Sequence, residues 1–278
     1  MTRRHELDLH REKLHDIRNI MHSMKTLAHM EAHKLERTME TVFSLSKTID
    51  DMATDFLAFF SETRPVTDAG LKVVLLVGSG RGFCGDFNGQ VVQELQNAFP
   101  ETGQSAVHLI SIGSKLQSVL EEEGLESDFI EGADVSEEVT EVVASLSQVL
   151  SGYQETFSLY AIYHDEPDKA LTVEKLLPPF TSLDSAGKPF DSPPMINMPP
   201  RDFFLELTDF YLNNELHRIL NRSLLTENQL RIRHLENATR HLDKKTEALF
   251  LKINALRQEE IIEEIEVILL NQSDIKAV

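Results

Sequence analysis

Apolar residues recur in alternating steps of three and four along the first 60 residues. One series is Leu14, Met21, Ala28, Leu35, Val42, Ile49 and Phe56. Its partner series is Ile17, Met24, Glu31, Thr38, Leu45, Met52 and Phe59. This spacing predicts a helix from about residue 5 to 60 with a coiled-coil seam, interrupted by the polar Glu31 and Thr38. At 1.5 Å per residue the helix would be roughly 80 Å long, more than an ordinary globular domain needs.

A second amphipathic stretch begins after Pro199-Pro200 and runs to the end of the chain. Its apolar stripe includes Leu212, Leu216, Ile219, Leu235, Leu242, Leu249, Ile253, Leu256, Ile261, Ile265 and Ile268. The stretch predicts a helix of roughly 100 Å, which could pair antiparallel with the first helix because a whole domain separates them. The alternative is a bundle of shorter, broken helices.

The middle of the chain alternates strand and helix patterns. Predicted strands cover Lys72–Val77, Val107–Ile112 and Phe157–His164; predicted helices cover Gly89–Ala98, Ser114–Glu123 and Ser136–Leu150, the last with Ser136 as a possible cap. All 12 glycines and all 10 prolines lie between Pro65 and Pro200. Because these residues break helices, we expect a helix at 1–64, a Rossmann-like α/β domain at 65–200, with an extended proline-rich stretch at 178–200, and a helix at 201–278. The fold class is therefore α/β with long helices that form an antiparallel coiled coil.

Charge is distributed unevenly over these three parts. Residues 65–210 hold 7 Lys+Arg and 24 Asp+Glu, whereas residues 1–64 hold 10 and 11. An acidic middle repels phosphate backbones, which argues against nucleic-acid binding and is otherwise typical of a soluble surface. The single cysteine and the lack of a secretory, transit or membrane-spanning pattern favour a reducing cytoplasm.

A glycine-rich turn follows the first predicted strand. Gly80, Gly82 and Gly85 fit the G-x-G-x-x-G spacing that lets a backbone approach a pyrophosphate. The next strand ends without the acid that would hold a ribose, and Asp86 would place a negative charge beside the phosphates. We therefore favour a structural glycine turn and expect no cofactor, while nucleotide binding stays open as an alternative.

Candidate catalytic and metal-binding residues form no recognisable set. His29 and His33 share a helix face, but Met30 stands where a zinc protease has glutamate. Cys84 has no histidine partner, and the acids between Glu259 and Glu266 belong to an amphipathic helix. The pattern favours a mechanical or scaffold protein with no catalytic residue and no metal site of its own.

Three stretches resemble one family, the gamma subunit of F-type ATP synthases. KTLAHMEAHKLER (residues 25–37) is similar to the family's first helix, and GRGFCGDFN (residues 80–88) resembles D-R-G-L-C-G-G-L-N. The C-terminal stretches TENQLRIRHLENAT and NALRQEEIIEEI resemble S-E-H-x-x-R-M-x-A-M-x-x-A-T and N-x-A-R-Q-A-x-I-T-x-E-L. The matching residues are Lys25, Ala32, Lys34, Arg81, Gly82, Cys84, Gly85, Asn88, Glu227, Arg231, Ala238, Thr239, Asn254, Arg257, Gln258, Ile261 and Glu264.

The resemblance implies a central-stalk rotor that couples ion flow to ATP synthesis or hydrolysis. Its partners would be the alpha and beta subunits, the epsilon subunit and the c-ring, at the cytoplasmic face of the inner membrane. Arg257, Gln258 and Lys25 would contact the beta subunits. Asp86 and the acidic middle depart from the family pattern, which indicates a divergent member, such as one from an alternative or sodium-coupled synthase. Two alternatives remain: a coiled-coil adaptor outside any synthase, and a nucleotide-binding domain with helical arms.

Overall fold

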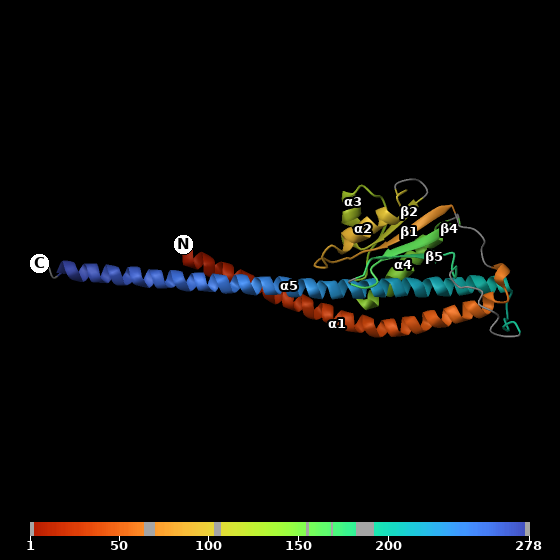
Figure 1. The fold of residues 1–278 in the computed structure, drawn as a ribbon, viewed down its shortest axis with the longest axis horizontal. Coiled ribbons are helices and arrows are strands. Elements are labelled where there is room, and N and C mark those ends of the chain that lie inside the picture. Colours follow the sequence, from red (N-terminus) through yellow and green to blue (C-terminus); the bar gives the residue numbers. More distant parts are fainter. Residues whose placement is uncertain are drawn as a thin grey trace. The chain divides into compact units, whose positions relative to one another are not determined.

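The computed structural model describes residues 3–63, 70–102, 107–153, 156–167, 169–181 and 192–275. Figure 1 shows two long helices and a sheet with shorter helices. In chain order the elements are α1 (Arg3–Leu57), η1 (Ser61–Thr63), β1 (Leu71–Val77), α2 (Phe87–Ala98), β2 (Val107–Ile112), α3 (Ser114–Glu122), β3 (Asp128–Ile130), η2 (Ser136–Glu138), α4 (Val139–Ser151), β4 (Phe157–Tyr163), β5 (Thr172–Leu177) and α5 (Pro200–Ile275). The predicted fold class, long terminal helices around an α/β sheet, is confirmed.

The sheet has the strand order β3-β2-β1-β4-β5. The first four strands are parallel, while β5 pairs antiparallel with β4. The strand β1, which reads LKVVLLV, lies at the centre and is buried on both faces, as expected for a continuous apolar run. The two edge strands, β3 and β5, were missed by the sequence pattern, because β3 has only three residues and β5 is partly exposed along most of its length.

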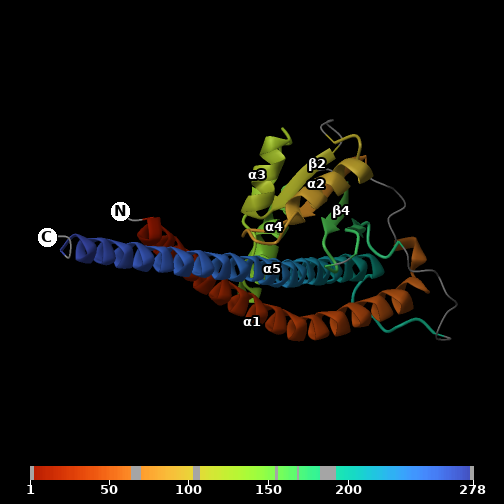
Figure 2. The ribbon, with the colours of Figure 1, turned by 60° about the vertical axis from the view of Figure 1, so that its left-hand side comes forward.

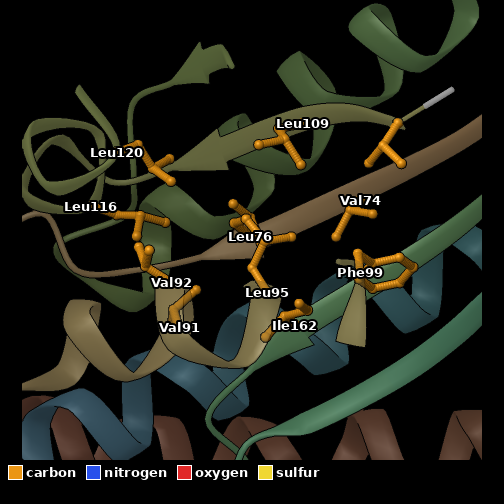
Figure 3. Packing of buried hydrophobic residues seen from close by; sticks show 11 residues of the cluster. Val74, Leu76, Val91, Val92, Leu95, Phe99, Leu109, Leu116, Leu120 and Ile162 are labelled. Carbon is orange, nitrogen blue, oxygen red and sulfur yellow. The ribbon is translucent and has the colours of Figure 1, made fainter. Parts of the chain in front are cut away.

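One face of the sheet packs against α2 and α3. Figure 3 shows this core, in which the side chains of both helices contact β1, β2 and β4. Its buried members are Val74, Leu76, Val91, Val92, Leu95, Phe99, Val107, Leu109, Leu116, Leu120 and Ile162. Val73, Leu75 and Val77, which alternate with them along β1, are buried too, so the opposite face of the sheet is also covered.

The helix that follows β3 begins differently from the prediction. Ser136 does not cap α4; it opens the short turn η2. The carboxylate of Glu138 accepts the N–H of Asp134 at 2.7 Å, and the carboxylate of Glu31 on α1 accepts the N–H of Ser136 at 3.3 Å. Free N–H groups at this helix start are therefore satisfied by glutamates, not by the serine hydroxyl.

The chain divides into two compact units, residues 1–27 with 232–278 and residues 28–231. In the first unit α1 and α5 run antiparallel: Arg4 pairs with Glu260, Arg18 with Asp243 and Lys25 with Glu236. In the second unit α1 and α5 are also antiparallel, because the Ser46 hydroxyl lies 3.2 Å from Glu215 while the Phe56 ring lies 4.8 Å from the Phe203 ring (Figure 2). None of the described helices carries an apolar stretch long enough to cross a bilayer.

The seam along α1 uses only one of the two predicted series. The series of Leu14, Met21, Ala28 and Leu35 is buried as predicted, but Ile17, Leu45 and Met52 of the partner series are exposed. The second row of the seam lies one residue later, at Arg18, Lys25, Ala32, Met39, Ser46 and Ala53. The predicted partner series was therefore wrong, and the polar interruption at Glu31 and Thr38 is not part of the seam. This row still joins α1 to α5, because its small or apolar residues pack against α5 and its polar residues form hydrogen bonds or ion pairs with α5.

Candidate functional site

The glycine turn between β1 and α2 is held by a small buried network. The Ser79 N–H donates to Asn88 Oδ1 at 2.9 Å, and Asn88 Nδ2 donates to the Ser79 hydroxyl at 2.9 Å. The thiol of Cys84 lies 3.4 Å from the same hydroxyl, and burial raises its pKa. The thiol therefore serves as a buried filler within the turn.

The three glycines of the predicted turn occupy different environments. Gly85 has a φ of 74°, a left-handed conformation that favours glycine. A Cβ on Gly80 would lie 3.1 Å from Asp134 Oδ1, whereas Gly82 has open space on its Cβ side. The carbonyl of Gly82 instead accepts a hydrogen bond from α5.

The middle of α5 docks on this turn through Arg231. Its Nε donates to the Gly82 carbonyl at 3.1 Å, and one terminal nitrogen donates to Asn228 Oδ1 at 3.1 Å. The other terminal nitrogen forms an ion pair with Glu227, and both side chains are more than nine-tenths buried. Burial raises the pKa of Glu227, while the charge of Arg231 opposes this rise. A buried charge pair of this kind fixes the position of the turn on the helix.

A second attachment joins α5 to the end of β4. Arg222 Nε donates to Asp165 Oδ1 at 2.7 Å, and the Thr226 hydroxyl donates to the Asp165 carbonyl at 3.1 Å. The carboxyl ends of β1 and β4 flank the point where the strand order reverses, which is where doubly wound folds bind ligands. Here Thr226 and Arg231 of α5 bond to the loops that follow these two strands, so the helix lies against this edge of the sheet.

A third attachment lies at Arg218, which is enclosed by hydrogen-bonding groups from three elements. Its guanidinium donates to Glu215 at 2.5 Å, to Glu174 of β5 at 2.6 Å and to the Tyr163 hydroxyl of β4 at 3.0 Å. Burial raises the pKa of Glu215, and the charge of Arg218 opposes the rise. The three attachments together form what we call the α5 joint: Arg218, Arg222, Thr226, Glu227 and Arg231.

The buried His164, next to the joint, makes stability depend on pH. Its Nε2 donates to the Phe87 carbonyl at 2.9 Å, its ring stacks on Phe87, and burial lowers its pKa. Above the unfolded-state pKa near 6.5 the His164 imidazole is neutral in both the folded and the unfolded protein, so its full contribution to the free energy of unfolding is present. As the pH falls below this value, the imidazole gains a proton in the unfolded protein first, and stability is lost. We expect the free energy of unfolding to fall by about 1 kcal/mol more between pH 7.5 and 5.5 in the parent than in His164→Gln. Urea unfolding at both pH values measures this, and equal losses in the two proteins would contradict it.

The predicted partner contacts lie elsewhere, on α1 and α5. Arg257 and Gln258 are both exposed. Lys25 is partly buried, and its Nζ lies 3.5 Å from Glu236. Within the part of the chain that the structure describes, no group of three or more histidine, cysteine, aspartate or glutamate side chains is arranged to hold a metal ion.

The family-like residues meet one another in the α5 joint. Gly82 comes from the second motif, and Glu227 and Arg231 come from the third. Lys34, from the first motif, forms an ion pair with Glu137 of η2. Sequence reasoning identified these residues by their motifs, but it missed Arg218 and Thr226, whose partners on β4, β5 and the loop after β4 lie far away in the chain.

Comparison with known proteins agrees with the motifs. A family model described as ATP synthase matches residues 4–270. An ATP synthase gamma chain from Clostridium botulinum (strain Langeland) is 22% identical over 92% of this chain and 93% of its own length. The gamma chain of Heliobacterium modesticaldum is 25% identical over 92% and 94%.

Solved structures show the same fold at low identity. The central stalk and c-ring structure of the Tetrahymena thermophila mitochondrial ATP synthase contains a chain with a TM-score of 0.55 and 18% identity, covering 79% of this chain and 99% of that one. A chain of the Euglena gracilis mitochondrial ATP synthase has a TM-score of 0.52 and 13% identity, covering 92% and 96%. Because the family model spans nearly the whole chain and the relatives align end to end, this chain belongs to the ATP synthase family, as a divergent relative of its gamma chains.

Proposed function

We propose that this chain is the central-stalk rotor, the gamma subunit, of an F-type ATP synthase. The curated relatives are gamma chains, and one solved neighbour is a central stalk. The chain is a non-catalytic component: it couples ion translocation through the membrane sector to ATP synthesis or hydrolysis at the beta subunits. It does so by making different contacts with their different states, since only differential contacts can shift an equilibrium.

The observation that carries this proposal is an exposed apolar surface on α1, which remains although other apolar residues of α1 are already buried against α5. Ile17, Ile20, Leu27 and Met30 of α1 are exposed, although the seam of α1 is buried against α5. Positions three, seven and ten residues apart lie on one helix face, so these side chains form an outer stripe. Exposed apolar stripes mark protein interfaces, and a surrounding ring of alpha and beta subunits would cover this one.

The far end of α5 offers a further apolar surface. Arg4, near the start of α1, pairs with Glu260, and α5 continues from there to Ile275. Ile261, Ile262, Ile265 and Ile268 are exposed in this stretch. The proposal places this end of α5 inside the ring as well.

The α/β domain would face the epsilon subunit and the c-ring. The chain would then be peripheral, held at the cytoplasmic face of the inner membrane only through the complex. The acidic middle of the chain argues against nucleic-acid binding, and the attachment of α5 to the loops after β1 and β4 argues against nucleotide binding there. The glycine turn of Gly80, Gly82 and Gly85 would be structural.

Co-expression with the alpha and beta subunits of the same organism tests the proposal. We expect a stable complex with three alpha and three beta subunits per copy that hydrolyses ATP. A chain that stays alone when both partners are present would instead support the coiled-coil adaptor.

The exposed pair Arg257 and Gln258, with Lys25, would contact loops of the beta subunits. An arginine suits this role because its guanidinium can bond carboxylates or carbonyls in pairs. We expect Arg257→Ala to reduce coupled ATP synthesis severalfold while changing the free energy of unfolding by less than about 0.5 kcal/mol, as for other exposed sites. Synthesis by reconstituted vesicles and urea unfolding of the free chain measure the two effects. Lys252→Ala, which removes an exposed cation from the same helix, is the control, and equal losses of synthesis in both variants would argue against a specific contact.

A further inference from the structure

The outer edge of β2 is only half covered. Asp128–Ile130 of β3 pair with Ile110–Ile112, and β1 pairs with the whole of β2 on its other side. Val107–Leu109 have no strand partner on the β3 side among the residues that the structure describes. An unpaired strand edge presents backbone N–H and C=O groups that can pair with another extended chain.

An open hollow of about 970 Å³ lies beside this uncovered edge. It is lined by Val107–Leu109, by Gln117 and Glu121 of α3, and by residues 124–128. Its volume is at the upper end of the range of pockets that hold ligands, and its open side faces solvent. The hollow therefore has room for a short extended segment beside β2.

The hollow is acidic. Glu121, Glu126 and Asp128 in its lining are exposed, and no ion pair with a lysine or arginine forms at any of the three within the described ranges. Among the described residues that line the hollow, His108 alone can carry a positive charge. The Tyr153 hydroxyl lies 3.4 Å from Asp128 Oδ2, and the Tyr153 ring meets the His108 ring edge-on, so these two aromatic side chains flank the hollow next to Asp128.

We propose that the hollow is a docking site for an extended, lysine- or arginine-rich segment of a partner protein, which adds as a short strand to the free edge of β2. Backbone pairing along β2 would supply the alignment, as in other cases of strand addition. The three carboxylates would select positively charged segments and repel acidic ones. The site lies on the α/β domain, so the proposal goes beyond the stalk role and does not depend on it.

Fluorescence anisotropy with the full chain tests this. The probe is a short fluorescein-labelled peptide of alternating lysine and valine, whose cations fall on one face of an extended strand. We expect it to bind, the corresponding glutamate–valine peptide not to bind, and added salt to weaken binding. The triple variant Glu121→Gln/Glu126→Gln/Asp128→Asn should weaken binding roughly tenfold, because three ion pairs near a surface are lost.

Two controls separate this site from general attraction. Glu40→Gln/Glu94→Gln/Glu141→Gln changes the net charge by the same amount away from the hollow and should bind like the parent. A lysine–valine peptide with alternate backbone amides methylated keeps its charge but cannot donate to β2, and it should bind roughly tenfold more weakly. Three results would each overturn the proposal. The two triple variants could lose peptide affinity equally, or the methylated peptide could bind as tightly as the unmethylated one. The chain could also self-associate in a way that the triple variant of the hollow abolishes. Circular dichroism confirms that the variants are folded.

Discussion

Replacing Arg231 with methionine is expected to lower the free energy of unfolding by about 3–5 kcal/mol. The substitution removes the cation that pairs with the buried Glu227 and the donor that holds the Gly82 carbonyl. The uncompensated carboxylate would remain in the protein interior, which costs far more than the loss of one surface contact. The effect should depend on pH: without Arg231 the pKa of Glu227 rises further, so the loss should be larger at pH 8 than at pH 5. Urea unfolding at the two pH values measures both effects.

The same helix provides a matched control. Arg240 pairs with Glu236 four residues earlier, just as Arg231 pairs with Glu227, but 72% of the Arg240 side chain is exposed against 8% for Arg231. Arg240→Met should therefore cost less than about 1 kcal/mol. The double variant Arg231→Met/Glu227→Gln should recover part of the loss, because it removes the buried charge. A single variant as stable as the parent would show that the pair does not hold the joint.

Replacing Phe56 with alanine is expected to cost about 3–5 kcal/mol through the cavity it leaves. Phe56 is 1% exposed near the end of α1 and lies 4.9 Å from the Phe60 ring and 4.8 Å from the Phe203 ring. Its cluster joins the last turns of α1 to the first turns of α5, with Ile49, Ala53, Leu57, Phe180, Phe204 and Leu207 as the other buried members. Thermal and urea unfolding measure the loss.

Phe43→Ala is the control on the same helix. The Phe43 side chain is 49% exposed, and its ring contacts the Arg222 guanidinium at 5.8 Å. Its removal leaves little cavity, so we expect a loss of less than about 1 kcal/mol. Similar losses in the two variants would mean that the Phe56 cluster is loosely packed.

The fold was predictable where one pattern dominated. The glycine and proline map predicted the two long helices, and the apolar run of β1 predicted the central strand. The edge strands β3 and β5 could not be predicted, because an edge strand is stabilised by its neighbour and not by its own pattern. The prediction of the α1 seam was wrong for another reason. Two candidate rows flank the buried row that contains Leu14, and the more apolar of the two, with Ile17 and Leu45, faces outward. Apolar periodicity shows which residues seek burial, but it does not show whether an internal or an external partner covers them.

The site was predictable only in part, for a related reason. Gly82 was recognised in one motif and Glu227 and Arg231 in another, but nothing in the sequence indicated that the two motifs touch. Arg218 and Thr226 carried no signal, since a polar residue on an amphipathic helix reads as solvent-exposed until its partners on β4, β5 and the loop after β4 are known.

The spacing of the α5 joint has a mechanical consequence. Arg218 and Arg231 lie about 20 Å apart along the helix axis at 1.5 Å per residue. A domain held at one point could tilt on the helix about that point, but attachments at both ends of a span of about 20 Å resist this tilting as a pair of opposed forces. The attachments are ion pairs and hydrogen bonds with preferred directions, so the α/β domain should keep one orientation on this stretch of α5. Removing the attachments at one end of the joint should therefore let the domain tilt on α5.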